Sequence, residues 1–358
     1  MMLGFDEERD ENFDLVHLNK VSEPEFQVAA ITEAKDDLSA AVRTARRVYP
    51  GLLPASLPRH VVIKPNLCDI TSWETGVTTD PRWMAALSVE LRSIRPDVQI
   101  RVVESDAISA YKTYRSCDET FERLGFVSAA REAGIELVNL SRCDTIELRL
   151  DGVPMPVRIP ELFLSEMLFI SVANLKVHPY TRMTGILKNS LGLLSDADIS
   201  SFHPHLSALI SGLHLLCPPD LCIIDGRVGL EGQGPIIGYP VRMNTILFGN
   251  DALATDEAAC HLMGIPPHQV PHLRQSAKDL KRSFGQYKTI GEIHPKPFVF
   301  ESLETHRAIL TKFRIRRFYQ RMDLFTSRWV DRAHRLRHNP ISFAKSAVSK
   351  LVGGRRGQ

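Results

Sequence analysis

Short runs of β-branched and other apolar residues alternate along the chain with segments in which apolar residues recur every three or four positions. The runs that predict strands cover residues 61–64, 100–104, 135–140, 168–173, 221–225 and 245–248. Several of these runs are apolar throughout, which is typical of parallel strands covered on both faces. The pattern therefore predicts an α/β fold with a mostly parallel central sheet and helices on both of its faces.

Three segments combine helical spacing with recognisable ends. The first begins near Asp80 and Pro81, which are expected to serve as N-cap and first helical residue. A second helix is expected over residues 206–216. A third is expected from the N-cap Asp251 to Gly264, where two prolines follow and prevent its continuation.

Residues 145–150 alternate between apolar and polar side chains and are followed by the turn pair Asp151-Gly152. The chain then returns through Pro154 and Pro156, so the segment predicts a β-hairpin. Because proline has no N–H to donate, the returning strand is expected at a sheet edge.

The pattern changes after about residue 297. Apolar residues then recur at spacings of three, four or seven, with Arg or Lys filling much of the rest: Ile315, Phe318, Met322, Phe325, Trp329 and Leu336. This spacing predicts a long basic amphipathic helix that breaks at Asn339-Pro340. We expect an acidic N-terminal segment over residues 1–22, an α/β domain over 23–298 and a basic helical tail over 299–358.

The formal net charge of +2 conceals an uneven distribution. Residues 305–358 carry fourteen Lys or Arg against two Asp, so this stretch is +12 and the rest of the chain is −10. An anionic partner is expected to meet the tail first. The tail therefore suits an anionic membrane surface or an acidic partner, or its apolar stripe packs on the domain. The acidic body and the lack of a base-reading motif argue against nucleic acid.

Cysteine spacing and the N-terminal residues bear on the compartment. None of the six cysteines forms a C-x-x-C pair, which predicts no iron–sulfur cluster on this chain and mostly inert thiols in a reducing compartment. The first fourteen residues include six acids and no apolar core of a signal peptide. We expect a cytoplasmic protein, with peripheral contact at a membrane as the alternative; the sequence does not indicate an oligomeric state.

Lysine and asparagine residues recur where the predicted strands end, the place where open α/β sheets bind their ligands. Lysine supplies a point charge for phosphate or carboxylate, and asparagine supplies both donors and acceptors. The sequence therefore predicts a site for a small anionic metabolite. Its expected ligand-binding residues are Lys64, Asn66, Asn174, Lys176, Lys188 and Asn189.

A glycine-rich segment, residues 225–235, follows one of the predicted strands. Its order is G-x-x-G-x-G, followed by Pro235, so it does not match the dinucleotide-binding fingerprint G-x-G-x-x-G. Two interpretations remain for Gly232 and Gly234. They belong either to a loop whose N–H groups hold an oxyanion of the ligand or to a tight structural turn.

Four side chains are candidates for catalysis or metal binding. His178 follows Lys176 closely and is the candidate acid or base. Asp225 and Glu231 flank the glycine-rich segment and are candidate bases. Together with Asp256 they offer oxygen ligands of the kind that a divalent metal prefers.

Six segments in the same order resemble the family known as domain of unknown function 362. They are Lys64-Pro65-Asn66, Gly76-Val77-Thr78-Thr79-Asp80-Pro81, Asn174-Leu175-Lys176-Val177-His178, Gly185 with Lys188-Asn189, Asp225-Gly226 with Glu231-Gly232-Gln233-Gly234-Pro235, and Asp251 with Asp256. The resemblance covers residues of about 60–265 and implies the fold of that family and a set of polar positions, but no activity. Many members carry ferredoxin-like cysteine clusters, which this chain lacks, so an iron–sulfur role does not carry over.

Three functions compete at this point. The first, which we favour, is an enzyme in which the lysines hold a small anionic metabolite and His178, Glu231 or Asp225 transfers protons, with or without a metal. The second is a non-catalytic ligand- or metal-binding protein, or the partner of a redox protein. The third is a peripheral membrane adaptor that acts through the basic tail.

Overall fold

The computed structural model describes residues 26–32, 37–108, 114–197 and 199–301 of the chain. The acidic segment 1–22 and almost all of the basic tail 299–358 lie outside these residues, and so does the predicted amphipathic helix. Among the described residues, no helix combines the length and the apolar character needed to cross a membrane.

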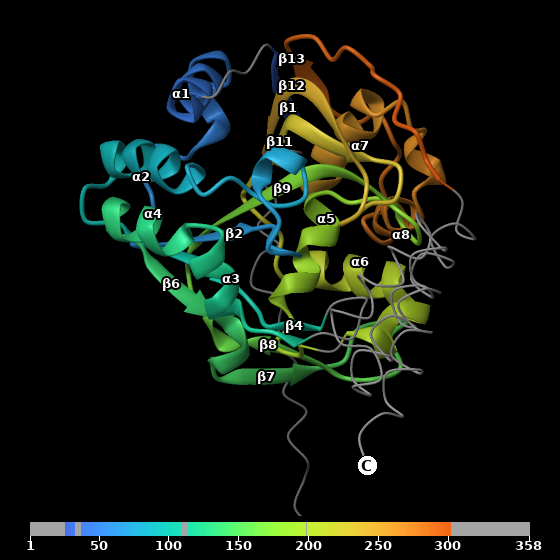
Figure 1. Ribbon diagram of the computed structural model, residues 1–358, viewed down its shortest axis with the longest axis horizontal. Coiled ribbons are helices and arrows are strands. Elements are labelled where there is room, and N and C mark those ends of the chain that lie inside the picture. The colour runs from blue at the N-terminus through green and yellow to red at the C-terminus, as the bar shows by residue number, and fades with distance from the viewer. Residues whose placement is uncertain (1–25, 33–36, 109–113, 198, 302–358) are drawn as a thin grey trace, which may run out of the picture.

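A nine-stranded sheet forms the centre of the molecule (Figure 1). Its order is β13-β1-β12-β11-β9-β2-β3-β6, and β10 pairs with β9. The five strands from β11 to β6 are parallel, whereas β12 runs antiparallel to both β11 and β1. The strands are β1 (Gln27–Ile31), β2 (His60–Pro65), β3 (Gln99–Glu104), β6 (Glu136–Asn139), β9 (Leu168–His178), β10 (Arg182–Met183), β11 (Leu221–Glu231), β12 (Tyr239–Gly249) and β13 (Lys288–Ile290).

Helices cover both faces of this sheet (Figure 1). One layer consists of α1 (Leu38–Val48), α2 (Trp83–Ile94), α3 (Cys117–Arg123) and α4 (Phe126–Ala133). The other consists of α5 (Ile186–Asn189), α6 (Leu206–Leu216), α7 (Ala252–Leu262) and α8 (Pro271–Asp279). Two two-stranded sheets lie apart from the main one: β4 (Ala107–Ile108) with β5 (Tyr114–Arg115), and β7 (Thr145–Leu148) with β8 (Val157–Pro160).

The two layers enclose two separate apolar cores because side chains alternate between the faces of a strand. On β2, Val61 and Ile63 belong to the core that packs the first helical layer. Val62, between them, belongs to the core that packs the second. A strand covered on both faces must be apolar at every position, which is why this run could be recognised as a central strand.

The fold class predicted from the sequence is confirmed, and each of the six predicted strands is present. The helix over residues 206–216 and the hairpin over residues 145–160 are also found. The hairpin forms its own two-stranded sheet, and Pro154 and Pro156 lie before β8 rather than in it. The prediction missed β1 and β13, which are short and extend the sheet beyond β12.

Two boundaries differ from the prediction. The strands β9 and β11 do not end at their apolar runs but continue over the polar residues that follow, as far as His178 and Glu231. The helix α2 begins at Trp83, two residues later than predicted. The Asp80 carboxylate still accepts a hydrogen bond from the N–H of Arg82 at 2.9 Å and also binds the side chains of Arg82 and Arg227. Asp251 is the N-cap of α7 as predicted, and its side chain accepts a hydrogen bond from the N–H of Ala254 at 2.8 Å.

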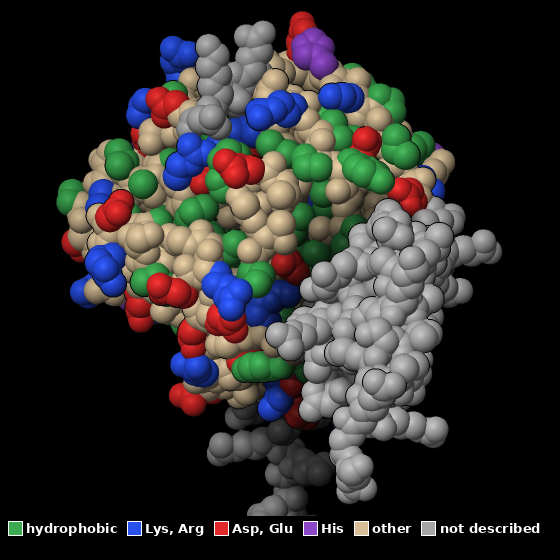
Figure 2. Space-filling model, in the orientation of Figure 1, with side chains coloured by type: hydrophobic (Ala, Val, Ile, Leu, Met, Phe, Trp, Pro, Cys, Tyr) green, Lys and Arg blue, Asp and Glu red, His purple; other side chains and the backbone are tan. Residues whose placement is uncertain are grey.

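Basic and acidic side chains are interspersed over the face of the molecule shown in Figure 2. The described part of this face therefore presents no large surface of a single charge. The charged groups that matter for a ligand are those placed below the surface, at the edge of the sheet where the parallel strands end.

Candidate functional site

A cavity of about 180 Å³ lies beside the carboxyl ends of β2, β3 and β9 and the short helix α5. We refer to it as the α5 cavity. These strands are parallel, with β2 between the other two, so their carboxyl ends meet at one edge of the sheet. All six predicted lysine and asparagine residues line it: Lys64, Asn66, Asn174, Lys176, Lys188 and Asn189.

Lys64, on β2, is buried in an ion pair with Glu104, the last residue of β3. Its Nζ donates to Glu104 Oε2 at 2.6 Å and to the carbonyl oxygen of Pro65 at 2.9 Å. Gly192 lies directly against the pair, where a Cβ would collide with both charged groups. Because a carboxylate already balances its charge, Lys64 contributes to the wall of the cavity more than to its net charge.

Lys176, on β9, is buried but has no carboxylate partner. Its Nζ donates to the carbonyl oxygen of Val77 at 2.8 Å, to Asn66 Oδ1 at 3.2 Å and to Cys68 Sγ at 3.2 Å. Asn66 Nδ2 in turn donates to Asn174 Oδ1 at 2.9 Å, which joins the end of β2 to β9. The three N–H donors of the ammonium are therefore used, while its positive charge is not neutralised by an ion pair among the described residues.

The side chains of Asn174 and Asn189 also form their hydrogen bonds mainly with other groups of the protein. Asn189 Nδ2 donates to the carbonyl oxygen of Lys64 at 3.1 Å and to Ser171 Oγ at 3.0 Å. Asn174 Nδ2 donates to the carbonyl oxygen of Thr78 at 3.1 Å. Since an amide has two N–H donors, Asn174 keeps one for a ligand and Asn189 keeps none. The two residues predicted to bind a ligand thus have a structural role as well.

The helix α5 carries Lys188, and Asp256 on α7 fixes where that helix begins. The Asp256 carboxylate accepts hydrogen bonds from the N–H groups of Ile186 at 2.7 Å and Leu187 at 3.0 Å. Gly185 makes this possible, because a Cβ there would collide with the carboxylate. Burial raises the pKa of Asp256 to about 7, although the two N–H groups act in the opposite direction.

Lys188 differs from the other two lysines of the cavity. It is half-buried, and within the described residues its ammonium forms no hydrogen bond or ion pair. Burial, together with the positive charge of Lys176, lowers the pKa of Lys188 to about 8. Lys188 is therefore mainly a cation at neutral pH but releases its proton far more readily than a surface lysine.

His178, Gly232 and Gly234 do not line the α5 cavity. They lie around a separate, much smaller hollow, because β9 has passed the cavity by the time it reaches His178 and pairs there with β10. The His178 ring accepts hydrogen bonds at Nδ1 from the N–H groups of Tyr180 and Thr181, both at 3.2 Å. The structure therefore does not place the predicted acid or base beside the predicted anion site.

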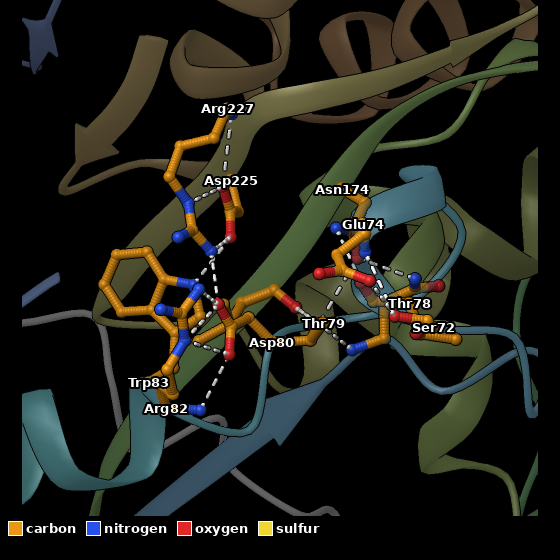
Figure 3. Close-up of polar contacts among 12 residues, drawn as sticks. Ser72, Glu74, Thr78, Thr79, Asp80, Arg82, Trp83, Asn174, Asp225 and Arg227 are labelled. Atoms are coloured by element: carbon orange, nitrogen blue, oxygen red, sulfur yellow. Dashed lines mark hydrogen bonds and ion pairs between the residues drawn. The ribbon is translucent and has the colours of Figure 1, made fainter. Parts of the chain in front are cut away.

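Asp225 lies in a buried ion network at the start of α2 (Figure 3) and does not line the cavity. Arg227 Nη2 donates to Asp225 Oδ2 at 2.8 Å and to Asp80 Oδ2 at 2.7 Å, and Trp83 Nε1 donates to Asp225 at 2.9 Å. Arg82 binds Asp80 from the outer side. Burial opposes the charge of Arg227, but its hydrogen bonds and ion pairs with Asp225 and Asp80 outweigh burial and raise its pKa. These pairings give Asp225 a structural role.

The three carboxylates considered for a metal ion are not brought together. Asp225 binds Arg227, and Asp256 binds the first turn of α5. Glu231 Oε2 accepts a hydrogen bond from the N–H of Val299 at 2.8 Å and fastens that segment to β11. No cluster of three His, Cys, Asp or Glu side chains suited to a metal occurs in the described part of the chain. The predicted shared metal site is therefore not formed by these residues.

The glycine-rich segment is a strand over residues 225–231 and a turn beyond it: Gly232 has a positive φ of 82° and Gly234 lies in the turn that leads to β12, as the second interpretation predicted. Most of it is strand: β11 runs to Glu231 and pairs with β12, with one irregularity between Gly226 and Val228. Gly229 lacks a side chain because the Phe298 ring packs where its Cβ would be. The N–H of Gly232 donates to the carbonyl oxygen of Val299 at 2.8 Å and so does not face an oxyanion.

Two side chains that contact the lysines of the cavity, Glu104 and Cys68, were not among the predicted residues. Glu104 is the last residue of a predicted strand, so the rule that singled out Lys64 could have found it. Cys68 lies two residues after Asn66, and its Sγ also approaches the carbonyl oxygen of Val77 at 3.5 Å. A lone cysteine in a loop gives no signal of its own; only the fold places it against Lys176.

Comparisons with known proteins point to one family. No curated protein matches the chain. One solved structure with similarity is the lactate racemase apoprotein from Thermoanaerobacterium thermosaccharolyticum, at 12% sequence identity and a TM-score of 0.33. The match covers 62% of this chain and 54% of that one, so the chain spans about half the length of that protein. A family profile matches residues 61–261, which include all six lysines and asparagines of the cavity. That stretch is more than half of the chain, and the chain therefore belongs to the family described as domain of unknown function DUF362.

Proposed function

We propose that the protein binds a small anionic metabolite, one that bears a carboxylate or a phosphate, in the α5 cavity. The observation that carries this proposal is the Lys188 ammonium, which lines the cavity and has no partner among the described residues. A cation held below the surface without a counter-ion is costly, and an anionic ligand removes that cost.

The charges around the cavity support an anion over a cation. Glu104 is paired with Lys64, and Asp196 with Arg158. The remaining acid is Asp106, whose carboxylate accepts hydrogen bonds from Tyr114 Oη, Cys117 N and Asn139 Nδ2. With these two ion pairs set aside, one carboxylate stands against the ammonium groups of Lys176 and Lys188, so the charge that is not neutralised by an ion pair at the cavity is positive.

The size of the cavity restricts the ligand. About 180 Å³ is available, whereas pockets for drug-sized ligands are on the order of 300–1,000 Å³. An engineered cavity of about 150 Å³ in another protein holds one benzene molecule. The α5 cavity therefore suits a metabolite with about six to ten non-hydrogen atoms and excludes a whole dinucleotide.

Binding of small carboxylates and phosphate, measured by calorimetry at constant ionic strength, tests the proposal. We expect Lys188→Met to weaken binding by roughly 10- to 150-fold, the loss of one charge-assisted hydrogen bond. Lys278→Met is the matched control, because Lys278 is an exposed lysine on α8. Equal affinity in the Lys188→Met variant and the unaltered protein would show that the anion binds elsewhere.

An enzymatic role rests on Lys188 as well. A pKa of about 8 lets this amine accept and release a proton near neutral pH, as a general acid or base requires. His178, Asp225 and Glu231 lie outside the cavity, so Lys188 replaces them in the proposed chemistry. Turnover is tested by incubating the protein with each metabolite that binds and following the loss of that metabolite by mass spectrometry.

A further inference from the structure

Lys188 combines features that binding alone does not require. Of the three lysines in the cavity, Lys64 donates to a carboxylate and Lys176 uses all its donors on the protein. Lys188 has neither kind of partner within the described residues, so its Nζ is free to approach a ligand in the cavity. We propose that Lys188 is a nucleophile that forms an imine with the carbonyl carbon of a small 2-oxo acid.

This inference rests on the proposed function, since the same cavity must first admit the anion. The step itself balances without a further reagent. The lone pair of the neutral Nζ forms a bond to the carbonyl carbon, and the carbonyl oxygen takes up the proton that the nitrogen loses. Loss of a second N–H proton with that hydroxyl group releases one water and leaves the C=N bond.

A nucleophilic lysine must be partly unprotonated, and its surroundings provide this. The low pKa of Lys188 arises from burial and from the positive charge of Lys176, the two means by which such lysines are activated. The other titratable groups whose charges interact with Lys188 are Cys68, after β2, and His272 on α8. Burial lowers the pKa of His272 to about 3, so this ring stays neutral and adds no charge.

The arrangement favours a 2-oxo acid over an isolated aldehyde or ketone. In a 2-oxo acid the carbonyl carbon is bonded to the carboxylate, so the imine nitrogen, once it takes up a proton from water, carries its positive charge beside that carboxylate. The free N–H of the Asn174 amide and the uncompensated charge of Lys176 are available to the same group. Acids of three to five carbons fall within the size that the cavity admits.

Reductive trapping tests the proposal on the full-length protein. Pyruvate and sodium cyanoborohydride are added, and the modified residue is identified by peptide mass spectrometry. We expect one dominant adduct at Lys188, absent from Lys188→Arg and Lys188→Met and unchanged in Lys278→Met. The initial rate should rise with pH around a midpoint near 8. At pH 8 it should exceed that of a surface lysine roughly a hundredfold, because a surface amine titrates near 10.4.

Binding and bond formation are separated by comparing pyruvate with lactate, which has a hydroxyl group in place of the carbonyl. If both acids bind but pyruvate forms no adduct above the surface-lysine background, the imine is refuted and the anion site stands. If neither acid binds but phosphate does, the imine is refuted and the anion site stands; if none of the three binds, both proposals fail. A dominant adduct on Lys64, Lys176 or any lysine other than Lys188 would overturn the assignment of the nucleophile.

Discussion

The α5 cavity and the buried ion network at the start of α2 both hold basic side chains below the surface of the same sheet. In the ion network, Arg227 is bound by two buried carboxylates, Asp80 and Asp225, which neutralise its charge within the protein. In the cavity, Lys176 and Lys188 have no carboxylate partner among the described residues, although the same fold buries or half-buries them.

This difference distinguishes charges that are neutralised within the protein from charges that a ligand could neutralise. A buried cation with its carboxylates in place stabilises local geometry but offers nothing to a ligand. A buried cation without them is held at a cost in free energy, and an anionic ligand would lower that cost. Counting lysines and carboxylates in the sequence does not make this distinction; only their pairing does.

The largest change in the free energy of unfolding is expected from breaking the ion network of Arg227, Asp80 and Asp225. Arg227→Met leaves Asp80 and Asp225 without their buried cation and should lower the free energy of unfolding by about 3 to 5 kcal/mol. Arg82→Met is the control, because Arg82 also binds Asp80 and also stacks on Trp73 but is 47% exposed. It should cost less than about 1 kcal/mol. Urea unfolding measures both, and equal losses would contradict a special role for the buried pairing.

A smaller loss in the free energy of unfolding is expected from breaking the ion pair between Lys64 and Glu104 in the wall of the α5 cavity. Lys64→Met leaves Glu104 largely buried with no cation and should cost about 2 to 4 kcal/mol. Arg101→Met removes the more exposed pair with Glu136 and should cost less than about 1 kcal/mol. If the charge of Glu104 is the cause, Lys64→Met with Glu104→Gln should be more stable than Lys64→Met alone. Unfolding by urea at pH 7 distinguishes these outcomes.

The smallest effect, and one of opposite sign, is expected at Lys188. Its folded-state pKa of about 8 lies below the unfolded value of about 10.4, so the unfolded state binds more protons between these values. The charged form therefore destabilises the folded protein at pH 7, and the penalty fades as pH rises through both values. Lys188→Met should be more stable by about 1 to 2 kcal/mol at pH 7 and about equal at pH 10.5, allowing for partial exposure.

Urea unfolding of the Lys188→Met variant at the two pH values provides the measurement. Lys278→Met, at an exposed position, should change stability little at either pH. A Lys188→Met variant that is less stable than the unaltered protein at pH 7 would mean that Lys188 already has a stabilising partner. Lys188 would then resemble Lys64 and Arg227, whose charges are neutralised by carboxylates of the protein.

The local pattern of the chain was sufficient for the fold class and for much of the cavity. Runs of apolar residues marked β2, β3, β9 and β11, because strands buried on both faces need apolar side chains throughout. The carboxyl ends of such strands meet at one edge of the sheet, so polar residues there could be expected to lie together. That argument selected six residues that do line one cavity, and it needed no tertiary information.

Only the tertiary structure decided which charges are free. Asp225 and Glu231 looked like catalytic carboxylates, yet they bind Arg227 and the backbone of Val299. The glycines of β11 looked like a loop, yet they admit a neighbouring backbone and ring. Lys188 looked like Lys64, and what separates them is a carboxylate from another strand. Ion pairing depends on distances of a few ångströms between residues far apart in sequence, which no local pattern contains.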